Sequence, residues 1–469
     1  MTLAHRNWTG KAAAKSESRK DEKLVKAPVQ LSDCRNILEA SAFRVEKIVS
    51  REILDSRGNP TVQVDLHTKS GFGRFSVPSG ASKGHLEALE LRDGERQRYN
   101  GLGVQKALEN ISRVIAPKIL GLDSRDQPKI DQLLNELDGT ENKSRLGANA
   151  ILGISIALAR ASADTANSPL YRTVADGRKL VLPLPMMNII NGGKHAGNDL
   201  SFQEFMVIPA GFKTFHEALR CGTEVYHALK ARLEAKYGKS AINVGDEGGF
   251  APNINSVEAA LGQINDAVEE AGYSPGQNVV LGVDAAADSF YKEDKQTYLV
   301  DGKQISSGDL FGLYDELGRS FPLKSIEDPF HEEDFDNFAR ITKKLGSRFQ
   351  IVGDDLFVTN IKRVEMGIRL GAANALLVKV NQIGTLTETI EAVEKARRAG
   401  YGLVMSHRSG ETEDTSIADI SVGLATGQIK TGAPARGERT CKYNRLIQIE
   451  EELGSAASFY GPEFLKKHQ

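Results

Sequence analysis

Polar side chains follow one apolar run in a density that folding alone does not require. Residues 401–405 read Tyr-Gly-Leu-Val-Met, which predicts a short buried strand. The next nine positions, 406–414, read Ser-His-Arg-Ser-Gly-Glu-Thr-Glu-Asp and bring together an imidazole, a guanidinium, hydroxyls and three acids. Such a set at the mouth of a buried strand indicates a site for an anionic small molecule.

Three carboxylates end three other short apolar runs: Asp284 follows residues 279–283, Glu327 follows 323–326 and Asp354 follows 349–353. Acids packed together raise one another's pKa values unless a positive charge lies among them. Oxygen ligands without Cys or His suit a hard cation, of which Mg²⁺ is the first choice. A single acid at a strand end is explained equally well by a helix N-cap or a salt bridge. Three of them favour a metal site.

Two lysines end similar runs. Lys379 follows the apolar residues 375–378, and Lys430 closes the run 427–429. In a cavity charged by metal ions, the nearby cations would lower the pKa of Lys379 and make it a usable base. Lys430 could act as its partner. The alternative for each is an ordinary lysine whose ammonium reaches solvent.

Two glycine-rich segments bring further acids and a histidine. Residues 243–253 carry Asp246 and Glu247 between glycines, which let the backbone approach a ligand closely, although a plain tight turn would use them too. Gln203 and Glu204 stand between two apolar runs and could add a second acid. The loops 79–84 and 192–197, the second with His195, are typical of mobile lids. Neither loop has the phosphate-loop pattern.

The spacing of these runs predicts the fold. From residue 323 onward the polar residues that end them recur about every 25 to 30 positions, which suits one strand–helix unit of a parallel barrel. Residues 183–469 are thus expected to form a (β/α)8-type catalytic barrel. Residues 43–178, with strands first and helices after, are expected to form an α+β capping domain. Active sites of such barrels lie at the C-terminal ends of the strands, so the polar residues should converge there.

Composition sets further bounds. The 469 residues are 40% hydrophobic and 26% charged, with a net charge of −2, so no overall field favours nucleic acid or a membrane surface. Three distant cysteines suit a reducing compartment, and the cytoplasm is the expected location. Residues 1–42 differ from the rest and are expected to be a disordered extension. An organelle-targeting peptide is the alternative reading.

Six strings, in order along residues 45–461, resemble the signatures of the enolase family. They are Asp55–Pro60, Val244–Gly249, Ser325–Pro329, Lys379–Gly384, Ser406–Asp414 and Gly427–Gly432. The resemblance implies the Mg²⁺-dependent, reversible dehydration of 2-phospho-D-glycerate to phosphoenolpyruvate, a lyase reaction of glycolysis and gluconeogenesis. It also implies two Mg²⁺ ions per active site and a homo-oligomer, a dimer or an octamer. No nucleic acid or membrane is required.

The resemblance assigns roles residue by residue. Asp284, Glu327 and Asp354 would hold the first ion, and Ser82 with the substrate phosphate would help hold the second. Lys379 resembles the base that takes the C2 proton, and Glu247 the acid that assists hydroxide departure, with Glu204 beside it. The substrate-binding candidates are Lys430 for the carboxylate, Arg408 and Ser409 for the phosphate, His195 and His407 to close the site, and Gln203.

The chain departs from the family pattern beside Ser82. The family usually has Thr where this chain has Lys83, and His85 and Leu86 look transposed, which concerns second-metal affinity and lid closure. Two other functions are possible in principle. A racemase or lactonising enzyme on the same barrel typically lacks the arginine–serine phosphate site and these glycine-rich loops. A non-catalytic binding or structural protein would be expected to have lost Lys379, Glu247 or a metal acid, and none is missing.

Overall fold

The computed structural model describes residues 41–80, 84 and 86–468. Residues 1–40, and with them most of the expected extension, lie outside the described part of the chain. So do Ser82, Lys83 and His85, which means that the expected role of Ser82 in holding a metal is not tested by the structure.

The first described part is an antiparallel sheet of three strands, β1 (Val45–Leu54), β2 (Pro60–Thr68) and β3 (Phe72–Ser76), in the order β1-β2-β3. The turn between β1 and β2 forms because the Asp55 side chain accepts hydrogen bonds from the backbone N–H groups of Arg57 and Asn59, both at 2.9 Å. Gly58 takes a positive φ of 75°, which suits glycine. These strands precede the helices of this part of the chain, in the order that the sequence predicted.

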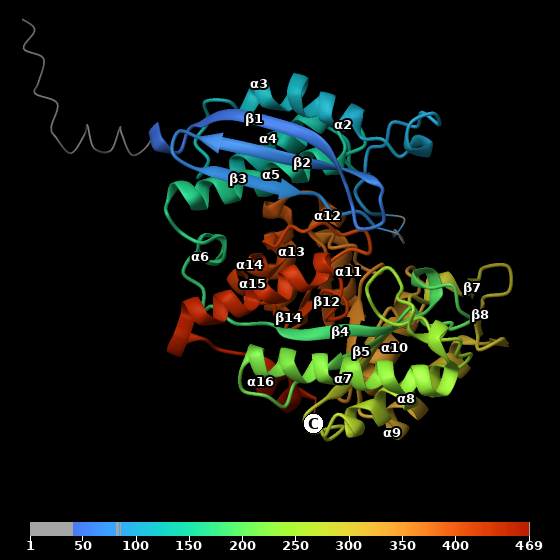
Figure 1. The fold of residues 1–469 in the computed structure, drawn as a ribbon. Coiled ribbons are helices and arrows are strands. Elements are labelled where there is room, and N and C mark those ends of the chain that lie inside the picture. The colour runs from blue at the N-terminus through green and yellow to red at the C-terminus, as the bar shows by residue number, and fades with distance from the viewer. Residues whose placement is uncertain (1–40, 81–83, 85, 469) are drawn as a thin grey trace, which may run out of the picture. The chain divides into compact units, whose positions relative to one another are not determined.

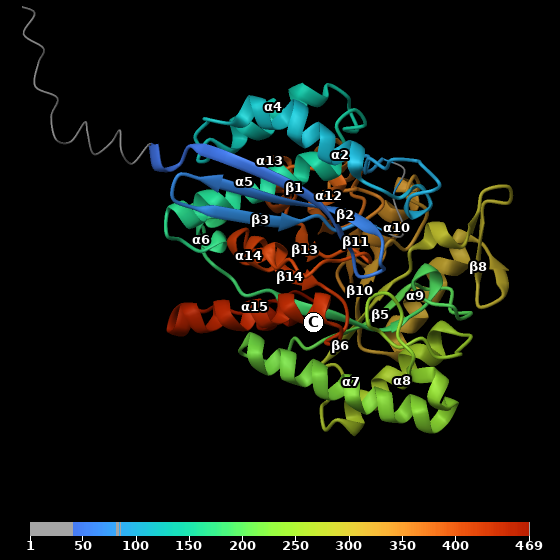
Figure 2. The same ribbon diagram turned by 45° about the horizontal axis from the view of Figure 1, so that its top comes forward.

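Helices then cover one face of this sheet. The longest, α5 (Ala148–Thr165), is buried over nearly its whole length because small and aliphatic residues occupy every side of it. It packs between β2 and β3 on one side and α12 and α13 on the other (Figures 1 and 2). The other helical elements here are η1 (Tyr99–Gly101), α2 (Gln105–Asn110), η2 (Ile111–Ile115), α3 (Ala116–Ile119), α4 (Gln127–Asp138) and α6 (Leu170–Ala175).

Eight strands close into a barrel, as predicted. Around the barrel they are β4 (Leu184–Asn191), β5 (Glu204–Ile208), β6 (Val280–Asp284), β10 (Leu323–Glu327), β11 (Gln350–Gly353), β12 (Ala375–Val378), β13 (Gly402–Ser406) and β14 (Gly427–Lys430).

Helices surround the barrel. They are α7 (Phe215–Tyr237), α8 (Val257–Glu270), α9 (Ser307–Ser320), α10 (Phe335–Leu345), α11 (Ile361–Leu370), α12 (Val380–Ile383), α13 (Leu386–Arg398), α14 (Ser416–Gly423), α15 (Gly437–Leu453) and α16 (Gly461–Lys467). Short 3₁₀ segments are η3 (Gly193–His195), η4 (Lys239–Ile242), η5 (Ala287–Ser289) and η6 (Gly454–Ala456). A small side sheet consists of β7 (Tyr291–Lys292), β8 (Thr297–Val300) and β9 (Lys303–Ile305).

The barrel departs from the predicted parallel arrangement at one strand. β5 follows β4 without an intervening helix longer than η3 and runs antiparallel to both β4 and β6. Its first residue, Glu204, therefore pairs with Asn191 and Asp284, which are the last residues of their strands. The reversal brings a carboxylate to the same barrel end as the C-terminal residues of the seven parallel strands.

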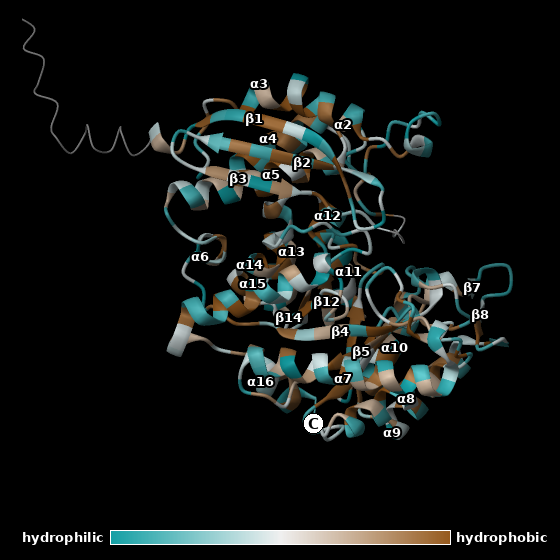
Figure 3. Ribbon diagram, viewed as in Figure 1, coloured by the Kyte–Doolittle hydropathy of each residue, from teal (hydrophilic) through white to brown (hydrophobic). Residues whose placement is uncertain are grey.

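The two ends of the barrel differ in polarity. Inside the barrel, an apolar cluster gathers residues near the N-terminal ends of the parallel strands, among them Leu184, Val280 and Ala375, together with Ile208 at the end of β5. Phe464 from α16 packs against this cluster. Figure 3 shows apolar strands in the barrel interior and polar residues on the outer helix faces. The core thus fills one end and leaves the other end for chemistry. Within the described residues, no helix is long and apolar enough to cross a bilayer.

Candidate active site

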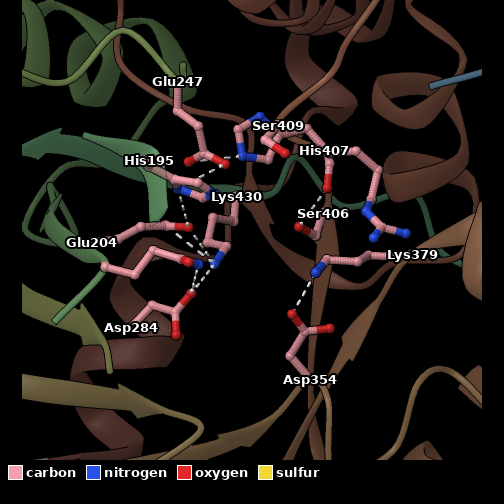
Figure 4. A pocket seen from close by; sticks show the side chains of 12 residues that line it. His195, Glu204, Glu247, Asp284, Asp354, Lys379, Ser406, His407, Ser409 and Lys430 are labelled. Atoms are coloured by element: carbon pink, nitrogen blue, oxygen red, sulfur yellow. Dashed lines mark hydrogen bonds and ion pairs between the residues drawn. The ribbon is translucent and has the colours of Figure 1, made fainter. Parts of the chain in front are cut away.

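The C-terminal end of the barrel carries a small polar cavity (Figure 4). All nine residues predicted for catalysis or substrate binding line it, and so do two of the predicted metal ligands. The lining residues are His195, Gln203, Glu204, Glu247, Asp284, Asp354, Lys379, Ser406, His407, Arg408, Ser409 and Lys430. The third acid, Glu327, joins the site through Lys430. Ser406 was part of the motif but was not singled out by the sequence analysis.

Lys430 is the central cation of one half of the site. Its buried Nζ lies 2.8 Å from Glu327, 3.2 Å from Glu204 and 3.3 Å from Asp284. Burial lowers the pKa of Lys430, but these carboxylates outweigh burial and hold that pKa well above its usual value. The lysine therefore stays charged, and one positive charge is shared by three acids.

That single charge leaves a surplus of buried acid. Burial first, and then Asp284, raises the pKa of Glu327 well above its ordinary value. Among the described residues, the Oε2 atom of Glu327 is buried without a hydrogen-bond partner. A buried carboxylate oxygen without a donor is costly. The oxygen-only donor set and the unpartnered Glu327 oxygen fit a hard divalent cation.

The three predicted metal acids are not among the groups of described residues whose ligand atoms all lie within 4.8 Å of one another. Three other groups of described residues do bring ligand atoms within 4.8 Å of one another: His195 with Glu204 and Glu247, Asp288 with Glu332 and Asp355, and Asp328 with Asp354 and Asp355. The last group contains one predicted ligand, Asp354. Lysines contact each of the three predicted acids instead.

Lys379 faces the cavity from the end of β12 and forms an ion pair with Asp354. Its backbone N–H donates to Thr359 at 3.0 Å, and Gln382 donates to the other oxygen of Asp354 at 2.9 Å. Burial lowers the pKa of Lys379, but Asp354 outweighs burial and raises it. The protein's own charges thus act in the opposite direction to the cations that the sequence analysis invoked to lower this pKa.

Glu247 lies on the opposite wall, beside one amide donor and two imidazole rings. Asn188 donates to its Oε2 at 3.0 Å, and the Nε2 atom of His407 lies 3.3 Å from the same oxygen. The Nδ1 atom of His195 lies 3.6 Å from Glu247 and 3.8 Å from Glu204, so the imidazole stands between the two acids.

The two glutamates differ in their charge. Burial raises the pKa of Glu247, but His407 and His195 outweigh burial and hold it well below its ordinary value. For Glu204, burial and the neighbouring Glu247 raise the pKa well above its ordinary value. These directions favour a protonated Glu204 beside an ionised Glu247.

Arg408 is held by Glu87, from the N-terminal part of the chain, and by Asn381 of α12. The guanidinium donates to Glu87 and to Asn381, with both Nη1 distances at 2.9 Å. The sequence analysis missed Glu87. Glu87 lies in no segment with helical or strand periodicity. Its position a few residues after the loop 79–84 was the only sequence signal that could have pointed to it.

The predicted lid loops adjoin the site. Ser79 exchanges two backbone hydrogen bonds with Gly410, at 2.7 and 2.9 Å, so the start of the first loop is tied to the motif 406–414. In the second loop, a Cβ at Gly192 would lie 2.4 Å from the carbonyl oxygen of Phe202, so only glycine fits there. Movement of either loop stays a prediction.

Comparison with known proteins assigns the family. Residues 45–174 match the enolase N-terminal domain, and residues 179–468 match the enolase C-terminal TIM barrel domain. An enolase of Pyrococcus furiosus is 57% identical over 424 residues, covering 90% of this chain and 98% of the relative. An enolase of Methanocaldococcus jannaschii is 58% identical over 413 residues, covering 88% and 96%.

The chain belongs to the enolase family. The enolase resemblance drawn from the six sequence strings is thereby confirmed, and so is the fold class. Enolase family membership also implies a metal cofactor, which agrees with the acidic groups at the barrel mouth. It removes the alternative that the chain is a racemase or lactonising relative built on the same barrel.

Proposed function

We propose that this chain carries out the enolase reaction with Lys379 as the base and the Glu204–Glu247 pair as the source of the proton for the leaving group. The reaction is the reversible dehydration of 2-phospho-D-glycerate to phosphoenolpyruvate, and the enzyme is a lyase. One observation carries the assignment of roles. A lysine and a pair of glutamates face one another across a single buried cavity at the barrel mouth.

The base must remove a proton that is barely acidic. When Lys379 takes the proton from C2, the C–H bond breaks and its electrons stay on the substrate beside a carboxylate. Lys430, which reaches Glu204, Asp284 and Glu327, would contact that carboxylate and offset the new negative charge. Lys379 must be neutral to act, so the ion pair with Asp354 has to loosen before proton transfer.

Two Mg²⁺ ions at the barrel mouth are part of this proposal. Asp284, Glu327 and Asp354 would hold one ion, and Ser82 with the substrate phosphate would hold the other. Bound there, Mg²⁺ supplies positive charge next to the substrate carboxylate. The divalent charge would also replace the lysine ammonium beside Asp354 and lower the pKa of Lys379.

In the second half of the reaction, the electrons left at C2 form the C2=C3 double bond as the bond from C3 to the hydroxyl oxygen breaks. The leaving hydroxide takes the proton that rests on the glutamate pair and departs as water. Arg408 and Ser409 would bind the phosphate, because the guanidinium fork matches phosphate oxygens. His195, His407 and Gln203 line the same cavity and would close it around the substrate.

The oligomeric state, the location and the domain bounds are part of the same proposal. The chain would act as a homo-oligomer, a dimer or an octamer, in the cytoplasm and without nucleic acid. Its capping domain would comprise residues 43–178 and its catalytic barrel residues 183–469.

Absorbance from phosphoenolpyruvate formation tests the proposal. The purified chain is expected to turn over 2-phospho-D-glycerate with Mg²⁺, to lose turnover on addition of a chelator, and to regain it when Mg²⁺ is restored. Glyceric acid without the phosphate is the matched control and should not react. Turnover that persists after complete chelation would remove the metal assignment, and no turnover under any metal condition would remove the proposed function.

A further inference from the structure

Arg439 is a buried cation that none of the assigned roles includes. It lies in the first turn of α15, and its side chain is fully buried. The guanidinium donates to the carbonyl oxygens of Arg408 at 2.7 Å, Ser409 at 2.6 Å and Asp246 at 2.9 Å. It thus joins the segment after β13 to the loop that carries Glu247.

A fourth contact concerns the chemistry directly. The Nη1 atom of Arg439 lies 2.7 Å from the Nδ1 atom of His407. A guanidinium has N–H donors and no acceptor, so Nδ1 must accept this hydrogen bond and cannot carry a proton itself. The single proton of a neutral His407 ring is then on Nε2, the atom that lies 3.3 Å from Glu247.

We infer that Arg439 is a positioning residue, which keeps His407 neutral with its one proton on Nε2 and so presents an N–H donor to Glu247. The geometry leaves no room for the other tautomer, because a proton on Nδ1 would meet the N–H of the guanidinium.

The electrostatics agree with this geometry. Burial lowers the pKa of His407, Glu247 raises it, and Arg439 and Lys430 lower it again, to about 3. His407 is therefore neutral in the neutral range of pH although a carboxylate lies beside it.

The consequence for the reaction rests on the proposed function. A donor on Nε2 favours the ionised form of Glu247, and an ionised Glu247 leaves the proton of the pair on Glu204. Arg439 would thus act on the proton at the C3 hydroxyl through His407, without touching the substrate.

Nitrogen NMR of the histidine rings tests the inference on the full chain. The chain has nine histidines, so the His407 signals are assigned by their loss in His407→Asn. In the parent, Nδ1 of His407 is expected to be unprotonated and Nε2 protonated across the neutral range. A proton on Nδ1 in the parent would overturn the inference without any further variant.

Arg439→Met then removes the donor and keeps much of the side-chain volume. Nδ1 of His407 is expected to gain a proton, and kcat is expected to fall by roughly 10²-fold, the order of one acid–base contribution, with a smaller change in KM. An unchanged His407 ring in Arg439→Met would also overturn the inference.

Lys442→Met is the matched control. Lys442 lies one turn along the same helix, is equally buried, and holds the same segment through Glu411 at 2.8 Å, but it does not contact His407. Its loss should destabilise the chain and leave the His407 tautomer unchanged. If Lys442→Met shifts the ring as Arg439→Met does, the effect is general loosening and the specific role is wrong.

Should Arg439→Met fail to fold, Arg439→Lys replaces it. One ammonium cannot serve the four acceptors, so Nδ1 of His407 is expected to gain a proton in Arg439→Lys as well, and an unchanged ring would overturn the inference. Glu247→Gln separates the two proposals. Full activity in Glu247→Gln would remove the proposed role of the Glu204–Glu247 pair, whereas the tautomer in the parent would still decide the role of Arg439.

Discussion

Two charged clusters in this chain show opposite electrostatic balance. On the sheet β1–β3, Asp65 lies between two arginines, with Arg51 and Arg74 both at 2.6 Å. At the barrel mouth, Lys430 alone serves Glu204, Asp284 and Glu327. The first cluster has more cations than acids and is partly exposed on its arginine side. The second has fewer cations than acids and is buried.

The pKa directions follow from this difference. Burial raises the pKa of Asp65, but hydrogen bonds from Arg74 and Arg51 outweigh it, so the pKa lies below its ordinary value of 3.8. The pKa values of Glu204 and Glu327 lie well above theirs. In a cluster that only stabilises the fold, acids and cations balance one another. In a cluster that acts on a charged substrate, some charges stay unbalanced until the substrate and its metal bind.

Lys379→Ala, at the barrel mouth, is expected to have the largest effect on turnover. Turnover should fall by about 10⁴-fold because the group that takes the C2 proton is gone, while substrate binding should be largely kept. Turnover by phosphoenolpyruvate absorbance and substrate affinity by calorimetric titration check both halves. Near-normal activity would remove Lys379 as the base.

Lys430→Met tests, through the free energy of unfolding, how much the lysine shared by three acids stabilises the chain. It should cost about 3–5 kcal/mol of unfolding free energy in metal-free buffer, since three buried acids lose their only common partner. Denaturant unfolding with a chelator present measures it. Lys362→Met is the control, because Lys362 pairs with Glu141 on the open surface and its loss should not be measurable. An equal loss of unfolding free energy in Lys430→Met and Lys362→Met would contradict the difference drawn between the buried cluster and an exposed ion pair.

Glu204→Gln keeps the shape of the protonated carboxyl but cannot release its proton. The variant should fold normally, bind substrate within a few-fold of the parent, and lose roughly 10²-fold in kcat. Steady-state kinetics give kcat and KM separately. A kcat equal to that of the parent would show that the proton does not come from this pair.

Asp65→Asn is expected to have the smallest effect. It should cost about 1 kcal/mol of stability at neutral pH and leave kcat unchanged. Because the pKa of Asp65 is lowered in the folded chain, its contribution is complete above the ordinary value of 3.8 and is lost as pH falls through the folded value. Unfolding curves at several pH values check this. A cost that grows toward low pH would reverse the sign.

Much of the fold was predictable because local patterns encode it. Short apolar runs followed by Glu327, Asp354 and Lys379 recur at the spacing of barrel units, and each run does form a barrel strand. The direction of β5 was not predictable in this way. A five-residue apolar strand reads the same in both directions, and only pairing with β4 and β6 shows which way it runs.

The sequence by itself determined which chemical groups reach the barrel mouth, because strand length and apolar periodicity place the residue after each strand at the same end. The tertiary structure decided which of those groups carry a proton. Glu87 contacts Arg408, which is 321 positions away in the sequence, and Arg439 contacts His407, which is 32 positions away. Proton positions depend on burial and on distances of a few ångströms, and neither quantity exists until the chain has folded.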